Sequence, residues 1–393
     1  MNDVAEVGGE ADRHGPLQGL RIVELAGIGP APMAAMLLAD LGADIIRIDR
    51  LEPSRLGIAK PKQFDVLARG RPSVAVDLKH PDGLACVRDI VRCADGLIEG
   101  FRPGVMERLG LGPQDCFDVN PRLVYGRVTG WGQTGPLAQA AGHDLNYIAL
   151  TGALHAIGRA GQPPTPPLNL VGDFGGGGLY LAFGVVCALI ECQHSGRGQV
   201  VDAAMVDGAA TLMSSIYGMF GAGLHGPERG TNLLDSGAPH YEVYRCADGE
   251  YISIAPIETK FRGELFRRLG LAETEIPDLD DVAAWPDSKR VFADIFAQRT
   301  QEEWCAVLEG ADVCFAPVLS ALQAPHHLHN RARGTFVEID GVVQPAPGPR
   351  FGRSVPARPR SARECTMDAT KLLEAWGVDR ARTAQLRSAG IVK

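Results

Sequence analysis

The chain has 393 residues, of which 45% are hydrophobic, so it is long and apolar enough for a folded protein of two or three domains. Its formal net charge of −8 argues against a nucleic acid or an anionic membrane surface as the main partner. The nine cysteines are scattered and form no CxxC pair, which argues against a zinc ribbon, a thioredoxin motif and a disulfide scaffold. This cysteine usage is typical of a reducing cytoplasm.

The chain start and the apolar segments predict neither a signal peptide nor a membrane span. Residues 1–15 are polar, acidic and contain glycine, which predicts a disordered tail. The longest apolar run, from Leu179 to Ile190, is shorter than the roughly 20 residues that a membrane-spanning helix needs. We therefore expect a cytoplasmic protein with no membrane partner.

The first half of the chain alternates between strand and helix patterns, which predicts an α/β fold with a Rossmann-like parallel sheet. A polar connection over 51–71 interrupts the alternation and is long enough for a surface insertion or a functional loop. We expect a large domain over 16–200. The predicted strands are 20–25, 44–49, 73–78, 96–99 and 123–129, and the predicted helices are 33–41, 81–93 and 105–109.

The second half changes character. Two apolar helices are predicted over 178–195 and 201–221. The second helix is expected to form a linker between two domains, with the linker spanning 201–222. Strand patterns at 241–245 and 251–255 and a helix pattern at 259–269 predict a smaller α+β domain over 223–330. The segment 331–393 is expected to return as an extended strap, because 342–360 is rich in Pro, Arg and Gly.

Two short motifs place ionisable side chains at predicted helix starts. They are Gly142-His143-Asp144 and Gly172-Asp173-Phe174-Gly175. A neutral imidazole and a carboxylate both accept a proton near neutral pH, so His143 and Asp173 suit chemistry that needs two bases. The alternative is that Asp144 and Asp173 are helix N-caps and that His143 is an ordinary polar residue.

The turn after the first strand imitates a dinucleotide-binding fingerprint, with Gly27-Ile28-Gly29 and an acidic residue, Asp49, about 20 residues further on. The imitation fails because Pro32 stands at the third glycine position, and a sheet that binds another nucleotide is favoured. Arginines near the predicted strand ends could bind its phosphates, although each could also be a surface charge. They are Arg47, Arg50, Arg69, Arg71, Arg102 and Arg108.

Seven motifs in order resemble the family III coenzyme A transferases and, within them, the α-methylacyl-CoA racemases. They are Gly27-Ile28-Gly29-Pro30-Ala31-Pro32, Ala39-Asp40-Leu41-Gly42-Ala43, Arg47-Ile48-Asp49-Arg50, Phe101-Arg102-Pro103-Gly104-Val105, Thr129-Gly130-Trp131-Gly132-Gln133, Gly142-His143-Asp144-Leu145-Asn146-Tyr147 and Gly172-Asp173-Phe174-Gly175-Gly176. The resemblance runs from about Pro16 to Ser354. It implies a homodimer of interlocked subunits, each with a Rossmann-like large domain and a small domain joined by long helices.

The resemblance also implies roles for single residues. His143 and Asp173 would exchange the proton on the α-carbon of a 2-methylacyl-CoA thioester through an enolate, and Glu258 would orient the imidazole. The N–H of Asp144 is the candidate donor to the enolate oxygen. The reaction would need no cofactor beyond the CoA of the substrate. The residues implied to bind CoA are Arg50, Ala75, Leu78, Arg102, Arg108, Gly142 and Tyr147.

Three other functions stay open at this point. A CoA transferase of the same family would use Asp173 as an acyl-carrying nucleophile, but such enzymes lack a histidine at the position of His143. A non-catalytic CoA-binding protein and an NAD(P) oxidoreductase are the remaining alternatives.

Two further residue sets have both a functional and a structural interpretation. The run His326-His327-x-His329 has no carboxylate or cysteine close by in the sequence, so we expect a surface segment and no metal site. The predicted helix after Val201 carries three methionines, Met205, Met213 and Met219. They could form an adaptable surface for the acyl chain or simply fill the core.

Overall fold

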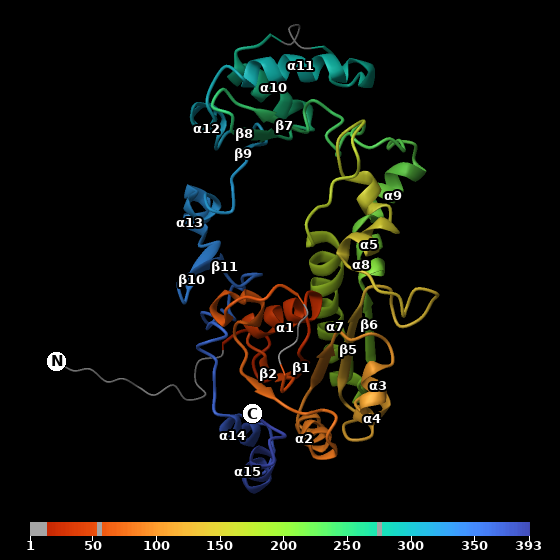
Figure 1. Ribbon diagram of the computed structural model, residues 1–393. Helices are drawn as coiled ribbons and strands as arrows, with labels where there is room; N and C mark the ends of the chain where they lie inside the picture. The colour runs from red at the N-terminus through yellow and green to blue at the C-terminus, as the bar shows by residue number, and fades with distance from the viewer. Residues whose placement is uncertain (1–13, 53–56, 273–276) are drawn as a thin grey trace, which may run out of the picture. The chain divides into compact units, whose positions relative to one another are not determined.

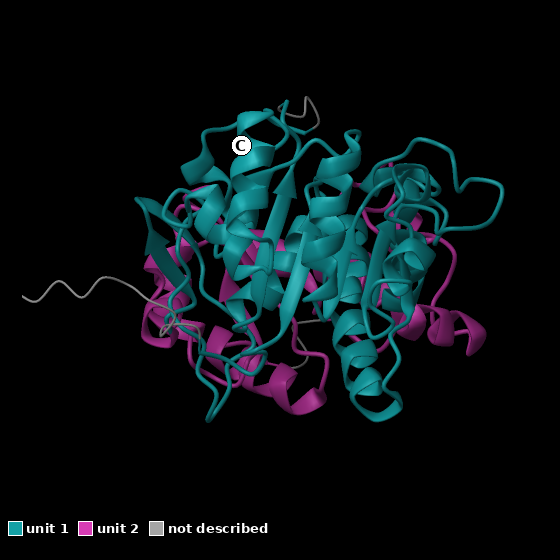
Figure 2. Ribbon diagram, turned by 90° about the horizontal axis from the view of Figure 1, so that it is seen from below, with its two compact units in different colours: residues 1–151, 168–212, 334–393 teal, residues 152–167, 213–333 magenta. Residues whose placement is uncertain are grey.

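The computed structural model describes residues 14–52, 57–272 and 277–393 (Figure 1). The chain divides into two compact units, which Figure 2 colours separately. Unit 1 comprises residues 1–151, 168–212 and 334–393, and unit 2 comprises 152–167 and 213–333. The segment 152–167 therefore groups with the smaller unit, although the sequence assigned it to the large domain. Of the expected N-terminal tail, 1–13 lie outside the described residues, while Gly15 lies against the backbone of Leu41.

Unit 1 is built on a six-stranded sheet with the strand order β3-β2-β1-β4-β5-β6, in which every neighbouring pair is parallel. The predicted parallel sheet is confirmed. The order reverses between β1 and β4, and in such sheets ligands bind outside the carboxyl ends of the strands at this point. The strands are β1 (Arg21–Leu25), β2 (Asp44–Asp49), β3 (Ser73–Ala75), β4 (Gly96–Glu99), β5 (Val124–Thr129) and β6 (Val200–Ala204).

Helices cover both faces of this sheet, because the strands bury apolar side chains on both. On one face α1 (Pro30–Asp40) and α7 (Tyr180–Ser195) pack over Ile22 and Ile45. On the other face Val23 and Ile46 pack with helices from both ends of the chain. These are α2 (Pro81–Arg92), α3 (Val105–Leu109), α4 (Pro113–Phe117), α14 (Ala369–Ala375) and α15 (Arg380–Ser388).

Two arginines considered for phosphate binding are instead buried in ion pairs. Arg71 Nε lies 2.6 Å from Glu24 Oε2, and Arg69 Nη2 lies 2.5 Å from Asp40 Oδ2. They lie at the end of the 51–71 connection, which contains η1 (Lys62–Phe64) and η2 (Val66–Ala68) and of which 53–56 lie outside the described residues. A buried charge needs a partner, so these guanidinium groups are committed to the fold.

The prediction of a helix over 201–221 is wrong for the first residues of that range. Val200–Ala204 forms the edge strand β6, paired with β5, and the helices that follow are α8 (Met205–Leu212) and α9 (Ser214–Gly221). A short apolar run fits a buried strand as well as a helix, and here the pairing with β5 decides.

The preceding helix is longer than its apolar run suggested. The π-helical segment η3 (Leu170–Leu179) continues into α7, and the resulting 26 residues are long and apolar enough to cross a membrane by length and composition alone. The core helix of a soluble protein passes the same test. Leu181 and Val185 of α7 are fully buried against the sheet.

Unit 2 contains a three-stranded antiparallel sheet in the order β7-β8-β9. Its core is aromatic: Tyr244 of β7 packs with Phe292, Phe296 and other buried side chains of the covering helices. Its elements are α6 (Ala153–Ala156), α9, β7 (Glu242–Arg245), β8 (Tyr251–Ile254), α10 (Thr259–Leu269), η5 (Val282–Ala284), α11 (Trp285–Phe296), α12 (Gln301–Leu308), β9 (Phe315–Pro317), η6 (Ala324–His326) and α13 (Leu328–Arg333).

The end of the chain belongs to unit 1, but it is more structured than an extended strap. It forms a hairpin of β10 (Phe336–Ile339) and β11 (Val342–Pro345), followed by α14 and α15. The last residues extend the sheet at its β3 edge, since Lys393 exchanges backbone hydrogen bonds with Ala75.

Candidate active site

Asp173 lies beside the loop that follows β1, where the strand order of the sheet reverses. It belongs to η3, and a β-carbon placed on Gly29 would lie 3.3 Å from its Oδ2 atom. Gly29 has a φ of 68°, which favours glycine, and Pro30 begins α1 at the position where a missing N–H is tolerated.

Glycines allow η3 to lie directly against α8. A β-carbon on Gly208 would lie 2.0 Å from the carbonyl oxygen of Gly176, and one on Gly176 would lie 2.6 Å from the backbone nitrogen of Ala209. The two backbones are therefore in direct contact. The glycines after Asp173 therefore set how closely η3 packs against α8. They also leave room for close approach of a ligand near Asp173.

The structure brings Asp173 together with the His143-Asp144 pair. Helix α5 (Asp144–Ala149) begins directly after His143, and Asp144 Oδ2 accepts a hydrogen bond of 2.6 Å from the backbone N–H of Asp173. The second carboxylate oxygen of Asp144 is buried without a hydrogen-bond partner among the described residues. The side chain of Asp144 thus connects the two elements that carry His143 and Asp173.

His143 is exposed, and its backbone is fixed by Asn146. The N–H of His143 donates to Asn146 Oδ1 at 3.0 Å, which caps the start of α5. As the first residue of α5, Asp144 has no partner for its N–H within the helix. This N–H is the donor predicted for an enolate oxygen.

The pKa of the Asp173 carboxyl is raised, mainly because burial disfavours the charged form. The nearby charge of Asp144 raises it further, whereas a hydrogen bond from Asn169 and the charge of His143 oppose the shift. Asn169 Nδ2 donates to Asp173 Oδ2 at 3.2 Å. Asn169 was not predicted from the sequence, where its only signal is an amide side chain four residues before the aspartate.

Tyr147 and Gly142, both predicted to contact CoA, contact each other beside His143. The Tyr147 hydroxyl donates to the carbonyl oxygen of Gly142, and its ring meets Trp131 edge-on at 4.8 Å. Gly130 makes room for this ring, because a β-carbon there would lie 2.0 Å from it. Burial raises the pKa of Tyr147 to about 12, and Asp173 adds to the shift. The positive charge of Arg102 opposes the rise in this pKa, so Arg102 lies near Tyr147.

The other residues predicted to bind CoA surround the carboxyl ends of the strands. Arg50 follows β2, and its guanidinium lies 5.6 Å from the ring centre of Phe101, which follows β4. Arg102 and Arg108 are exposed. Ala75 and Leu78 lie at the β3 edge, where the backbone of Ala75 is already paired with Lys393. Any contact of Ala75 with CoA would therefore use its side chain.

Glu258 belongs to unit 2, where it caps α10 and its carbonyl oxygen accepts hydrogen bonds from Phe261 and Arg262. Its predicted contact with the imidazole of His143, a residue of unit 1, stays a prediction.

The histidine run after Pro325 differs from the expectation in one respect. His327 Nε2 lies 2.9 Å from Glu309 Oε1, so a carboxylate distant in sequence does lie next to it. Within the described ranges, no three histidine, cysteine or acidic side chains are grouped as metal ligands would be.

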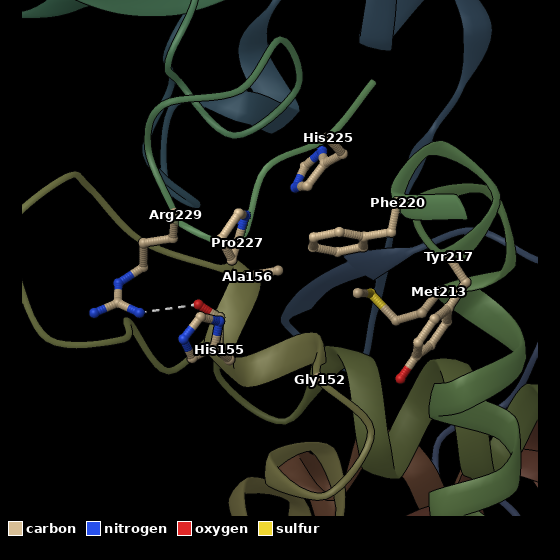
Figure 3. A pocket seen from close by; sticks show the side chains of 9 residues that line it. All are labelled: Gly152, His155, Ala156, Met213, Tyr217, Phe220, His225, Pro227 and Arg229. Atoms are coloured by element: carbon tan, nitrogen blue, oxygen red, sulfur yellow. Dashed lines mark hydrogen bonds between the residues drawn. The ribbon is translucent and has the colours of Figure 1, made fainter. Parts of the chain in front are cut away.

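The three methionines have different environments. Met205 is buried in the core of unit 1 under η3, so it is a packing residue. Met213 lines a pocket of about 110 Å³ in unit 2, together with Tyr217, Phe220 and His225 (Figure 3). Met219 lies on α9. A contact between an acyl chain and Met213 or Met219 stays a prediction.

Comparison with known proteins identifies the family. The sequence profile of CoA-transferase family III matches residues 17–364. The chain belongs to CoA-transferase family III. The resemblance stated from the seven motifs is therefore confirmed.

Two relatives are similar to this chain over almost their whole length. The α-methylacyl-CoA racemase of Mus musculus is 44% identical over 381 residues, which cover 96% of this chain and 97% of the mouse protein. The Homo sapiens α-methylacyl-CoA racemase is 43% identical over 380 residues, with the same coverage. A crystal structure of a CAIB/BAIF family protein from Brucella suis matches with a TM-score of 0.76 and 26% identity, covering 88% of this chain and 96% of that one.

Proposed function

We propose that this chain is a racemase that inverts the α-carbon of 2-methylacyl-CoA thioesters. The observation that carries the proposal is the hydrogen bond from the Asp173 backbone to the Asp144 carboxylate, which holds a histidine and a carboxyl group of raised pKa at one site. The printed names of the mouse and human relatives describe the same reaction.

In one direction, the neutral imidazole of His143 removes the proton from the α-carbon, and the electron pair of the C–H bond forms an enolate. Protonated Asp173 then gives its proton to the opposite face of the same carbon, leaving a carboxylate. In the other direction the roles are exchanged. The N–H of Asp144 stabilises the enolate oxygen, and the reaction uses no cofactor other than the CoA of the substrate.

The raised pKa of Asp173 favours this reaction over transfer of an acyl group. A raised pKa favours the protonated form of the carboxyl group, which can deliver a proton, over the ionised form, which alone is a nucleophile. Asp173 as the acyl-carrying nucleophile of a CoA transferase is the second candidate, because family III includes such enzymes.

The deciding experiment is incubation with one enantiomer of a 2-methylacyl-CoA in deuterated water without an acceptor acid. Racemisation introduces deuterium at C2 together with inversion, and we expect both. An added carboxylic acid tests for transfer, since a transferase would form its CoA ester. Transfer without exchange at C2, or no reaction at all, would contradict the racemase proposal.

We also propose that Arg50, Arg102 and Arg108 bind the phosphates of CoA, since all three follow strands or helix starts at the ligand-binding edge of the sheet and each is exposed. Replacement of any one by alanine is expected to raise KM more than it lowers kcat. The affinity for CoA is expected to fall as salt rises. Unchanged CoA affinity in Arg50→Ala would remove that residue from the site.

Finally, we propose that the protein acts as a homodimer. The outer faces of η3, α7 and α8 expose apolar side chains, and such surfaces mark interfaces. A helix that is apolar on all sides is normally covered on all sides. We propose that a second copy, and not a membrane, provides this cover. The exposed side chains on these elements and beside them are Leu168, Leu170, Leu179, Phe183, Ile190 and Leu212.

A further inference from the structure

The segment 99–108 of unit 1 begins at a carboxylate that is buried in the sheet. Glu99, the last residue of β4, is fully buried. Its Oε2 atom accepts a hydrogen bond of 2.7 Å from the N–H of Phe101, and its Oε1 atom accepts one of 2.7 Å from Nε of Arg127 on β5. These two bonds fix the direction in which the chain leaves the sheet, directly before Arg102.

The same guanidinium group also holds the other end of the segment. Nη1 and Nη2 of Arg127 lie 2.7 Å and 3.2 Å from the two carboxylate oxygens of Glu107, which is a bidentate arrangement. The hydrogen bond from Arg127 lowers the pKa of Glu107. Arg127 therefore ties both ends of the segment to β5. We call Glu99, Arg127 and Glu107 the Arg127 network.

Between these two ends the backbone makes a tight turn. Gly104 has a φ of 81°, which favours glycine, and its carbonyl oxygen accepts a hydrogen bond of 3.2 Å from the N–H of Arg108. A β-carbon on Gly104 would lie 3.1 Å from Nη1 of Arg108. The guanidinium of Arg108 thus lies beside the turn that also carries Arg102.

The Arg127 network leaves both of these arginines without an acidic partner. Arg102 and Arg108 are exposed, and within the described ranges neither forms an ion pair. The acidic residues nearest to them in the sequence are Glu99 and Glu107, and both are bound to Arg127. Two cations on one turn, with the neighbouring carboxylates engaged elsewhere, are available to a phosphate group.

We propose that the Arg127 network positions Arg102 and Arg108 for the phosphates of CoA. This inference rests on the proposed function, because it assigns the support of the proposed CoA site. Burying an ion pair costs desolvation that the attraction only partly offsets, so the network is weak evidence for stability. Its effect is to order the turn before the ligand arrives, which lowers the entropy cost of binding.

The test is the affinity for CoA of a variant with a charge effect of the opposite sign. In Glu107→Ala the turn loses its anchor at an exposed residue, so the fold is retained. Loss of a negative charge beside two cations would by itself maintain or increase the affinity for anionic CoA. A positioning role predicts affinity that is about fivefold or more weaker. Glu107→Gln, which keeps an acceptor for Arg127, is expected to restore part of it.

The affinity is measured by calorimetric titration of CoA into the full-length protein at low ionic strength, where charged contacts are least screened. Asp89→Ala is the matched control. It removes a carboxylate of unit 1 that pairs with Arg92 and Arg382 and belongs to α2, outside the Arg127 network. Its CoA affinity is expected to stay within about twofold of the wild-type value.

A second variant tests the buried end of the segment. Glu99→Gln keeps an acceptor for the N–H of Phe101 but removes the charge that faces Arg127, and it is expected to weaken CoA binding as well. Its control is Asp40→Asn, which removes the charge from the buried ion pair with Arg69. Asp40→Asn is expected to retain the CoA affinity.

A double-mutant cycle shows whether the Arg127 network acts through the two arginines. In a protein that already carries Arg102→Ala and Arg108→Ala, the further change Glu107→Ala is expected to weaken CoA binding by less than about twofold. The reason is that the side chains it positions are absent.

The proposal is overturned if folded Glu107→Ala or Glu99→Gln binds CoA as tightly as the wild-type protein, or if Glu107→Ala has its full effect without the two arginines. The deuterium experiment gives an independent result. Weakened CoA binding in Glu107→Ala, without exchange at C2 in the wild-type protein, would contradict the racemase proposal alone. Exchange at C2, with unchanged CoA affinity in Glu107→Ala, would contradict the role of the Arg127 network alone.

Discussion

At the scale of single residues, the ionisation of Asp173 links stability with function. Its pKa is raised from the ordinary value of 3.8. Between that value and the raised one, the folded state binds more protons than the unfolded state. The free energy of unfolding therefore falls as pH rises through this range, because ionisation of the buried carboxyl group destabilises the fold.

Asp173→Asn is therefore expected to raise the melting temperature at pH 7 while lowering racemisation by at least about 100-fold. The asparagine oxygen can still accept from Asn169, so the fold is retained. Calorimetric melting and the chiral assay measure the two effects. Asp207→Asn, an exposed change in the first turn of α8, is the control and should change stability by less than about 0.5 kcal/mol. A lower melting temperature for Asp173→Asn would contradict the proposed cost of ionisation.

Asn169 is a positioning residue that stabilises the carboxylate form of Asp173. Asn169→Ala removes the donor at 3.2 Å, so the pKa of Asp173 should rise further. In the direction in which Asp173 is proposed to act as the base, the acidic limb of the profile of kcat/KM against pH should then move to higher pH. A lower rate with an unmoved limb would indicate a merely structural role.

At the scale of elements, the contact between η3 and α8 determines where Asp173 lies. Gly208→Ala would force a β-carbon to within 2.0 Å of the Gly176 carbonyl oxygen, so one of the two backbones must move. We expect a loss of about 1–3 kcal/mol in stability, measured by denaturant unfolding, together with reduced activity.

Gly218→Ala on α9 is the matched control for this prediction, because nothing lies within 4 Å of the added atom. It is expected to leave stability unchanged or to raise it by up to about 1 kcal/mol. Equal effects of the two substitutions would show that the close backbone contact does not position Asp173.

At the scale of the whole molecule, the exposed apolar face of unit 1 predicts association of two copies. Phe183, on the outer face of α7, is 66% exposed in a single chain. Phe183→Glu would place a charge in the proposed interface and is expected to raise the dimer dissociation constant at least about tenfold, as measured by analytical ultracentrifugation.

Leu322→Glu is the control for association, because Leu322 is similarly exposed but belongs to unit 2. It is expected to leave the sedimentation behaviour unchanged. A wild-type protein that sediments as a monomer at micromolar concentration would contradict the proposed homodimer.

The sequence by itself determined the parallel sheet and the family, and it led to the prediction of His143 and Asp173 as catalytic residues, which stays a prediction. Strands such as Asp44–Asp49 and helices such as Thr259–Leu269 carry strong local patterns, and the motifs identify ionisable groups wherever they lie in space. These features depend on residue type and on neighbours in the chain.

Tertiary structure alone decided the rest. Val200–Ala204 is a strand because β5 supplies its partner, and Arg71 is a core residue because Glu24 lies opposite it. The hydrogen bond from Asp173 to Asp144 and the ion pair of Arg127 with Glu99 are likewise invisible in the sequence. Pairing, burial and the pKa shifts that follow from them depend on groups that are distant in the chain, and only the fold brings those groups together.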